Sequence, residues 1–156
     1  MDEETVRLMV EHGTWLDGTV SALYCILRGK DKGLPEEFYQ KAIDAEGQVY
    51  RSFNMAFHAG VPCAAGSDCG SSFCYHDESA IELVIMVEKC GITAMDAMVV
   101  GTINSARLCG VEESLGSVTV GKKAHFAVFA ENPAENIRAA MDCCMTVKNG
   151  EILWQK

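Results

Sequence analysis

The chain has 156 residues, of which 49% are hydrophobic, and a formal net charge of −9 at pH 7. Its length suits one compact domain, and its hydrophobic content argues against a disordered chain. The acidic charge, without clustered Lys and Arg, argues against nucleic acid or an anionic membrane surface as a partner. No apolar run is long enough for a membrane helix, and "MDEETVRLMV" lacks the apolar core of a secretory signal, so we expect a cytoplasmic protein.

The eight cysteines are expected to be reduced thiols, not a disulfide framework. Most lie inside apolar segments, such as Cys25 in "LYCIL" and Cys63 in "VPCAA", and the chain carries no export signal. Cys63, Cys69 and Cys74 do cluster along the sequence. Their spacing matches no zinc template, so a thiolate metal site is the less favoured alternative.

The N-terminal part predicts a helix, a short strand and a second, long helix. Residues 2–12 form the first helix, capped by Asp2 and stopped by Gly13. "TWLDGT" (14–19) reads as a short strand that runs into a loop. The long helix opens at Pro35 and ends before Gly60. The apolar faces predicted for the two helices comprise Val6, Met9 and Val10, and Phe38, Ala42, Ala45, Val49, Phe53 and Ala56.

The middle of the chain predicts a buried strand followed by two helices. "VPCAA" (61–65) has almost no polar residue, which is typical of a strand in a parallel sheet covered on both faces. The helix over 79–90 is apolar nearly all round and leaves a thin polar stripe of Glu78, Glu82 and Lys89. Thr93 and Asp96 form a variant capping box for the next helix. The buried face expected for that helix is Met95, Met98, Val99, Ile103 and Ala106.

The last segment changes to the alternation of β-strands. Four strands are expected, over 117–120, 124–130, 143–148 and 151–154. Asn149-Gly150, between the last two, is a strong signal for a tight hairpin turn. The change of period places a boundary near Glu112 to Gly116, which divides the chain into residues 1–112 and 113–156.

Asp68 is the carboxylate that calls for an explanation, because it stands among small residues where the strand over 61–65 gives way to a glycine-rich loop. An Asp before a loop of this kind is most often a turn former. The surrounding motifs favour a different reading. The order and spacing of five motifs resemble those of metal-dependent amidohydrolases, in the branch of imidazolonepropionases and Xaa-Pro dipeptidase-like enzymes. The motifs are "GSDCG", His76, "AIELVIMVEKCGITAMDAM", "TINSARLCG" and "LGSVTVGKKAHFAVF".

The resemblance covers essentially the whole chain and implies an α/β fold. It implies the last two β/α units of a (β/α)8 barrel, from about the sixth to the eighth barrel helix and the helix after it, in residues 1–112. Residues 113–156 would supply the C-terminal strands of the family's small β-sandwich. Asp68 would then end the eighth barrel strand, at the face where barrel enzymes carry out their chemistry.

The resemblance also implies roles for individual residues. Asp68 corresponds to the family's catalytic Asp, which binds the divalent metal, here expected to be zinc, and shuttles a proton. His76 lies in the same loop, and relatives have a His near this place that faces the substrate. The alternative is an ordinary histidine of the loop or of the helix start. Asp17 follows the "TWL" strand and points toward the same face, which makes it a weaker candidate.

The departures from the family pattern are as informative as the match. This sequence has no counterpart of several metal ligands of the family. These are the His-x-His pair of the first barrel strand, the Lys or Glu of the fourth strand, and the one His on each of the fifth and sixth strands. His12 and His58 stand at helix ends, where a cation suits the helix dipole, and His125 reads as a sheet residue. A metal site needs about three or four protein ligands, so we expect the chain alone to be catalytically incomplete.

Three readings remain open. The favoured one is the C-terminal part of an amidohydrolase that hydrolyses C–N bonds in amides, cyclic amides or dipeptide-like small molecules. The second is a subunit of a split enzyme, whose missing barrel half comes from another polypeptide. The third is a non-catalytic remnant that self-associates through the sheet edges that an open barrel would expose.

Overall fold

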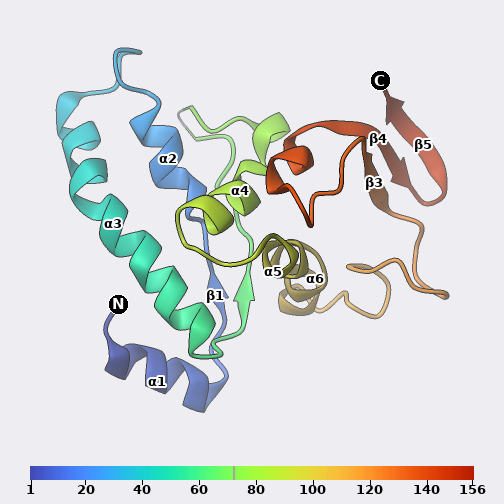
Figure 1. Cartoon of the computed structure of the whole chain (residues 1–156), viewed down its shortest axis with the longest axis horizontal. Helices are drawn as coiled ribbons and strands as arrows, with labels where there is room; N and C mark the ends of the chain where they lie inside the picture. Colours follow the sequence, from blue (N-terminus) through green and yellow to red (C-terminus); the bar gives the residue numbers. More distant parts are fainter. Residues whose placement is uncertain (72) are drawn as a thin grey trace.

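The computed structural model describes residues 1–71 and 73–156 and has a mixed α/β architecture, as expected (Figure 1). The first elements in chain order are α1 (Glu3–His12), β1 (Leu16–Asp17), α2 (Ser21–Leu27), α3 (Glu36–His58) and β2 (Cys63–Ala64). They are followed by η1 (His76–Glu78), α4 (Ile81–Glu88), α5 (Ala94–Val99), the π-helical turn η2 (Val100–Asn104) and α6 (Ser105–Leu108). The C-terminal elements are β3 (Phe126–Phe129), η3 (Ile137–Met141), β4 (Cys143–Lys148) and β5 (Glu151–Gln155).

β1 and β2 form a parallel pair, in which Leu16 is opposite Cys63 and Asp17 is opposite Ala64. Their carboxyl ends therefore lie at the same edge, and the loops that follow them meet there. Cys63 and Ala64 are buried, as the apolar run predicted. The core around them is built by residues from α3, β2, α4, α5 and η2, among them Phe53, Cys63, Val84, Ile85, Met86, Ala97 and Val100.

The two predicted N-terminal helices are present, with some of their apolar residues outside the core. The side chain of Asp2 caps α1 by accepting a hydrogen bond from the Thr5 N–H at 2.9 Å, and Gly13 ends it at φ 63°. Val10 and Phe38, expected to be buried, are 44% and 50% exposed. Phe38 lies in the first turn of α3, where the Lys41 ammonium is 5.7 Å from its ring centroid.

The face predicted for the helix after Thr93 is wrong in part. The Thr93 hydroxyl caps α5 as expected, by accepting from the Asp96 N–H at 3.1 Å. Met95 and Val99, however, are exposed, whereas Ala97 and Val100 are fully buried. The prediction assumed one α-helical repeat over the whole segment. The π-helical turn η2 breaks that repeat from Val100 onward, because a π turn takes up an extra residue. Met95 and Val99 precede this turn and lie on the side of α5 that the core does not cover.

The C-terminal sheet has the antiparallel order β3-β4-β5. Lys148 is opposite Glu151, and Asn149 and Gly150 between them have φ 52° and 82°, which confirms the hairpin. The strand expected over 117–120 is wrong. Val118 and Val120 are 88% and 103% exposed, and no strand among the described residues pairs with this segment.

Gly116 is expected to tolerate no side chain, because it packs closely against Ile103 and Ala106. Its φ is +87°, and a Cβ there would lie 2.6 Å from the Ala106 Cβ and 2.9 Å from the Ile103 Cα. Gly116→Ala should therefore lower the free energy of unfolding by about 2 kcal/mol, through overpacking and left-handed strain. Urea denaturation measures this. Gly33→Ala is a control, because it has a similar φ of +90° with no atom within 4 Å of the added Cβ.

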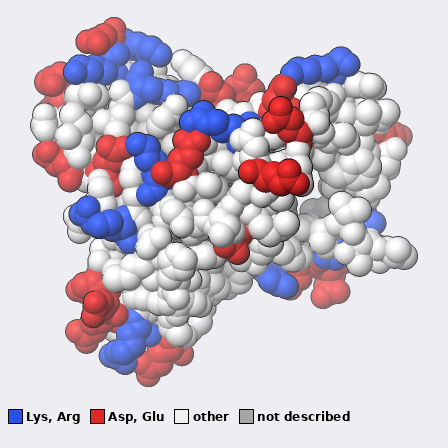
Figure 2. Space-filling model, in the orientation of Figure 1, with Lys and Arg blue, Asp and Glu red and all other residues white. Residues whose placement is uncertain are grey.

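Among the described residues, no helix combines the length and the hydropathy needed to cross a bilayer. In Figure 2, acidic and basic residues are interspersed over the part of the molecule that holds α1 and α3.

Candidate functional site

Asp68 lies in the loop that leaves the carboxyl end of β2, and its side chain is exposed. Its φ is 50°, in the left-handed region that Asp tolerates better than most residues. The Ser67 hydroxyl accepts a hydrogen bond from the Cys69 N–H at 3.4 Å across this turn, and Gly70 follows with φ 104°. Left-handed backbone at a non-glycine residue is often found at functional positions, so the geometry marks Asp68 as a candidate.

Asp17 reaches the same edge from β1. Its carboxylate occupies the space beside Gly66, where an added Cβ would lie 2.5 Å from Oδ2. The absence of a side chain at Gly66 is thus what lets a second carboxylate approach the start of the Asp68 loop. The parallel pairing of β1 and β2 brings these two acids, about fifty residues apart in the sequence, to one region.

His76 begins η1 and lies over the same loop. Its Nε2 is 3.1 Å from the position that a Cβ on Gly70 would take. The imidazole is exposed. The loop therefore brings His76 back toward the residues that follow Asp68. The other histidines lie elsewhere: His12 and His58 end α1 and α3, and His125 precedes β3, where its Nε2 is 2.7 Å from the Asn149 Oδ1.

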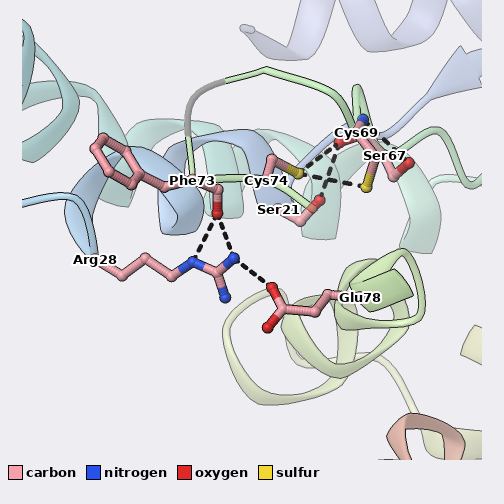
Figure 3. A network of polar contacts seen from close by, with 7 residues as sticks. All are labelled: Ser21, Arg28, Ser67, Cys69, Phe73, Cys74 and Glu78. Carbon is pink, nitrogen blue, oxygen red and sulfur yellow. Dashed lines mark hydrogen bonds and ion pairs between the residues drawn. The ribbon is translucent and has the colours of Figure 1, made fainter. Parts of the chain in front are cut away.

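Arg28 anchors the far side of the Asp68 loop (Figure 3). Its Nε donates a hydrogen bond of 2.8 Å to the Phe73 carbonyl oxygen, and its guanidinium forms an ion pair with Glu78. The Tyr75 ring packs against the same guanidinium, with its centroid 5.3 Å from Cζ. One side chain from the end of α2 thus joins three residues of the loop, an arrangement that the sequence pattern did not indicate.

Glu82 corrects the prediction of a solvent-facing polar stripe on α4. It is 2% exposed, and its two carboxylate oxygens accept hydrogen bonds from the N–H groups of Val20 and Ser21 at 2.8 and 2.7 Å. These N–H groups open α2, which has no side-chain cap of its own. The Ser21 hydroxyl in turn donates to the Ser67 carbonyl at 3.5 Å. Glu82 therefore helps to hold the loops that follow both β1 and β2.

The short helix α2 was not predicted, since nothing in its own residues signals its start. Its capping group comes from α4, some sixty residues later. A signal for Glu82 was available in the sequence, namely an acid within a helix that is otherwise apolar nearly all round. Such an acid is expected to have a partner in the core.

Burial raises the pKa of Glu82 above its ordinary value of 4.5, against the opposing effect of the hydrogen bonds from Ser21 and Val20. The folded chain then binds this proton more strongly than the unfolded chain does. Stability should therefore fall as pH rises above about 4.5 and level off above the folded-state pKa. Urea denaturation against pH measures this. A Glu82→Gln variant lacks the titrating group and should not show this fall of stability with pH. The same dependence of stability on pH in both proteins would contradict the raised pKa of Glu82.

The described residues do not form a metal site by themselves. In residues 1–71 and 73–156, no three His, Cys, Asp or Glu side chains are grouped so that they could hold a metal ion. The Cys69 and Cys74 thiols are in contact at 3.4 Å, but the Cys63 thiol donates to the Val61 carbonyl instead. Asp68 can supply one carboxylate, which is fewer than the ligands that such a centre needs.

The chain is similar to known hydrolases over nearly its whole length. It is 30% identical to ochratoxinase from Aspergillus niger over 138 residues, which are 88% of this chain and 28% of the relative. The structure of a Xaa-Pro dipeptidase with bound methionine aligns with a TM-score of 0.86 and 32% identity, over 100% of this chain and 38% of the other. Molinate hydrolase aligns with a TM-score of 0.72 and 25% identity, over 98% of this chain and 35% of the other.

The chain therefore spans between a quarter and two fifths of the length of these relatives. The profile of the amidohydrolase family matches residues 1–153, from the first helix to the last strand. This match and the relatives agree with the parallel strand pair that carries an aspartate at its carboxyl edge. The chain belongs to the amidohydrolase family.

Proposed function

We propose that this chain is the C-terminal part of a metal-dependent amidohydrolase. Residues 1–112 correspond to the last two β/α units of a (β/α)8 barrel, and residues 113–156 to the C-terminal strands of the small β-sandwich. The parallel pairing of β1 with β2 and the antiparallel order of β3, β4 and β5 support this assignment. The share of the relatives' length that the chain covers supports it too.

The complete enzyme, in this proposal, hydrolyses a C–N bond of a small amide, cyclic amide or dipeptide-like molecule. The similarity to a Xaa-Pro dipeptidase supports this substrate class. The observation that carries the proposal is the exposed Asp68 in left-handed backbone at the carboxyl end of β2, in a loop whose start at Gly66 adjoins the Asp17 carboxylate. A carboxylate in that position can accept the proton of an attacking water.

Asp68 is also proposed to be one ligand of a divalent metal in the complete enzyme, with zinc as the expected ion. The other ligands would come from barrel strands that this chain does not contain. His76 is proposed to contact the substrate, because it lies over Gly70 in the same loop. The predicted cytoplasmic compartment and the division near residue 112 stay predictions.

The purified chain alone is expected to show no hydrolysis of a panel of Xaa-Pro dipeptides and simple amides in the presence of zinc. Its described residues provide too few metal ligands. Activity should appear on mixing with a polypeptide that carries the family's first six barrel strands. It should then depend on Asp68, with Glu113→Ala, an exposed acid far along the chain, as control.

Hydrolysis by the chain alone, above the level of an Asp68→Ala variant, would contradict this proposal. An in-frame coding sequence upstream with a His-x-His strand would support a longer single chain. A separate, adjacent open reading frame with the same motif would support a split enzyme.

The non-catalytic alternative is favoured by one observation, the exposed apolar surface of the C-terminal segment. Val118, Val120, Ile152 and Leu153 are each at least 59% exposed, which is unusual for aliphatic side chains in a monomer. An apolar groove of about 690 Å³ also lies between α6 and β3. In this alternative the surface is covered by a second copy. Light scattering together with metal analysis tests this: a symmetric dimer without metal would favour the alternative, and a monomer would oppose it.

A further inference from the structure

The thiols of Cys69 and Cys74 lie in contact next to the candidate catalytic aspartate. Their sulfur atoms are 3.4 Å apart and point toward one another (Figure 3). The backbone is also close at this point, since the Gly70 N–H donates to the Cys74 carbonyl oxygen at 2.8 Å. Cys69 follows Asp68 directly in the chain. No role in the proposed hydrolysis uses either thiol.

The two thiols differ in their access to solvent. Cys69 is partly exposed, whereas Cys74 is buried, with 1% of its surface exposed. A small oxidant in solution can therefore meet the Cys69 sulfur first. The Cys74 sulfur is held where it can attack a modified Cys69. A reactive thiol with a resolving thiol at contact distance is the arrangement of reversible redox sites.

We propose that Cys69 and Cys74 are a redox-reactive pair that a hydroperoxide converts into an intramolecular disulfide. A disulfide bond is about 2.05 Å long, so the sulfurs need to approach by roughly 1.4 Å from their separation of 3.4 Å. The turn that holds them contains Gly70 at φ 104°, which gives the backbone room to adjust.

The reaction has two balanced steps. The Cys69 sulfur attacks one oxygen of hydrogen peroxide, the O–O bond breaks, and the thiol proton leaves with the other oxygen as water, which leaves a sulfenic acid. The Cys74 sulfur then attacks the Cys69 sulfur, the S–O bond breaks, and the hydroxyl leaves with the Cys74 proton as a second water. The two thiols lose two electrons in all, and the peroxide gains them.

The bond would restrain the segment that carries Asp68. Arg28 already fixes the far side of this loop through Phe73 and Glu78. A covalent link at Cys69 would fix the near side, immediately after Asp68. Because Cys69 is accessible, a thiol reductant can attack the bond, so the modification is reversible.

Cys25 is the competing partner. Its thiol lies near that of Cys74, but Cys25 is itself 1% exposed. Neither of these two buried thiols meets an oxidant directly. Cys109 is exposed to solvent, but it lies at the C-terminal end of α6 and not in the loop that holds the pair. Cys69 combines the two properties, because its thiol is partly exposed to solvent and contacts the thiol of Cys74.

The test is mass spectrometry of the reduced chain after limited hydrogen peroxide and then N-ethylmaleimide. The monomer should lose two of its eight free thiols and yield a peptide that links Cys69 to Cys74, and dithiothreitol should restore both thiols. Cys109→Ser should keep the same link. A chain that retains all its thiols, or links that join other cysteines instead, would overturn the proposal.

Single variants test the order of the steps. Cys74→Ser should leave a sulfenic acid on Cys69, which dimedone traps, whereas Cys69→Ser should give no dimedone adduct on Cys74. An adduct on Cys74 in the second variant, with none on Cys69 in the first, would contradict the assigned roles. Hydrolytic activity is not read in these experiments, so their outcome is independent of the proposed function.

Discussion

Asp68→Asn is expected to lower the kcat/KM of the completed enzyme by about 10³-fold, the scale of a lost general acid–base group. Asn keeps the size of the side chain and tolerates the left-handed backbone at φ 50°, so the loop should remain folded. What it loses is the ability to accept a proton from water. Steady-state hydrolysis of a Xaa-Pro dipeptide by the mixed polypeptides measures the effect.

Asp77→Asn is the matched control, because Asp77 is an exposed acid in η1 of the same segment. It should change kcat/KM little. If Asp68→Asn and Asp77→Asn have similar activity, Asp68 is a turn residue and not a catalytic one. Circular dichroism of each variant separates loss of chemistry from loss of fold.

Glu82→Ala is expected to lower the free energy of unfolding by about 3 kcal/mol. The substitution leaves the N–H groups of Val20 and Ser21 buried without their acceptor, and it opens a cavity in the core. It also removes the cap of α2 and so loosens the loops after β1 and β2. Urea denaturation followed by circular dichroism gives the free energy.

Glu88→Ala on the same helix is the control. Glu88 is exposed and pairs with Arg138 at 2.6 Å on the surface, and exposed pairs contribute about 1 kcal/mol or less. Equal losses for the two variants would mean that Glu82 is no more important than a surface acid. A larger loss for Glu82→Ala supports its role in holding the candidate site.

Local signals predicted the elements whose ends are determined by their own residues. Asp2 and Gly13 bound α1, Thr93 caps α5, and Asn149-Gly150 turns the last hairpin, each as expected. These features depend on residues within a few positions of one another. The strand predicted over 61–65 is present in shorter form as β2, whose two residues, Cys63 and Ala64, are buried as their apolar surroundings in the sequence indicated.

Predictions that needed a partner from elsewhere in the chain were less successful. "SVTV" has the alternation of a strand, but no described strand lies beside it, and a strand forms only with hydrogen-bond partners. The buried face after Thr93 includes Ala97 and not Met95 or Val99, because the packing of α5 against α4 selects the side that is covered.

The sequence by itself determined the family, the parallel strand that ends near Asp68, and the position of that aspartate at the start of a glycine-rich loop. These follow from the order of motifs and from local backbone preferences. Only the tertiary structure decided that Glu82 caps α2, that Arg28 fixes the loop, and that Cys69 meets Cys74. Each of these depends on contacts between separate segments, which packing creates and which no local pattern of residues encodes.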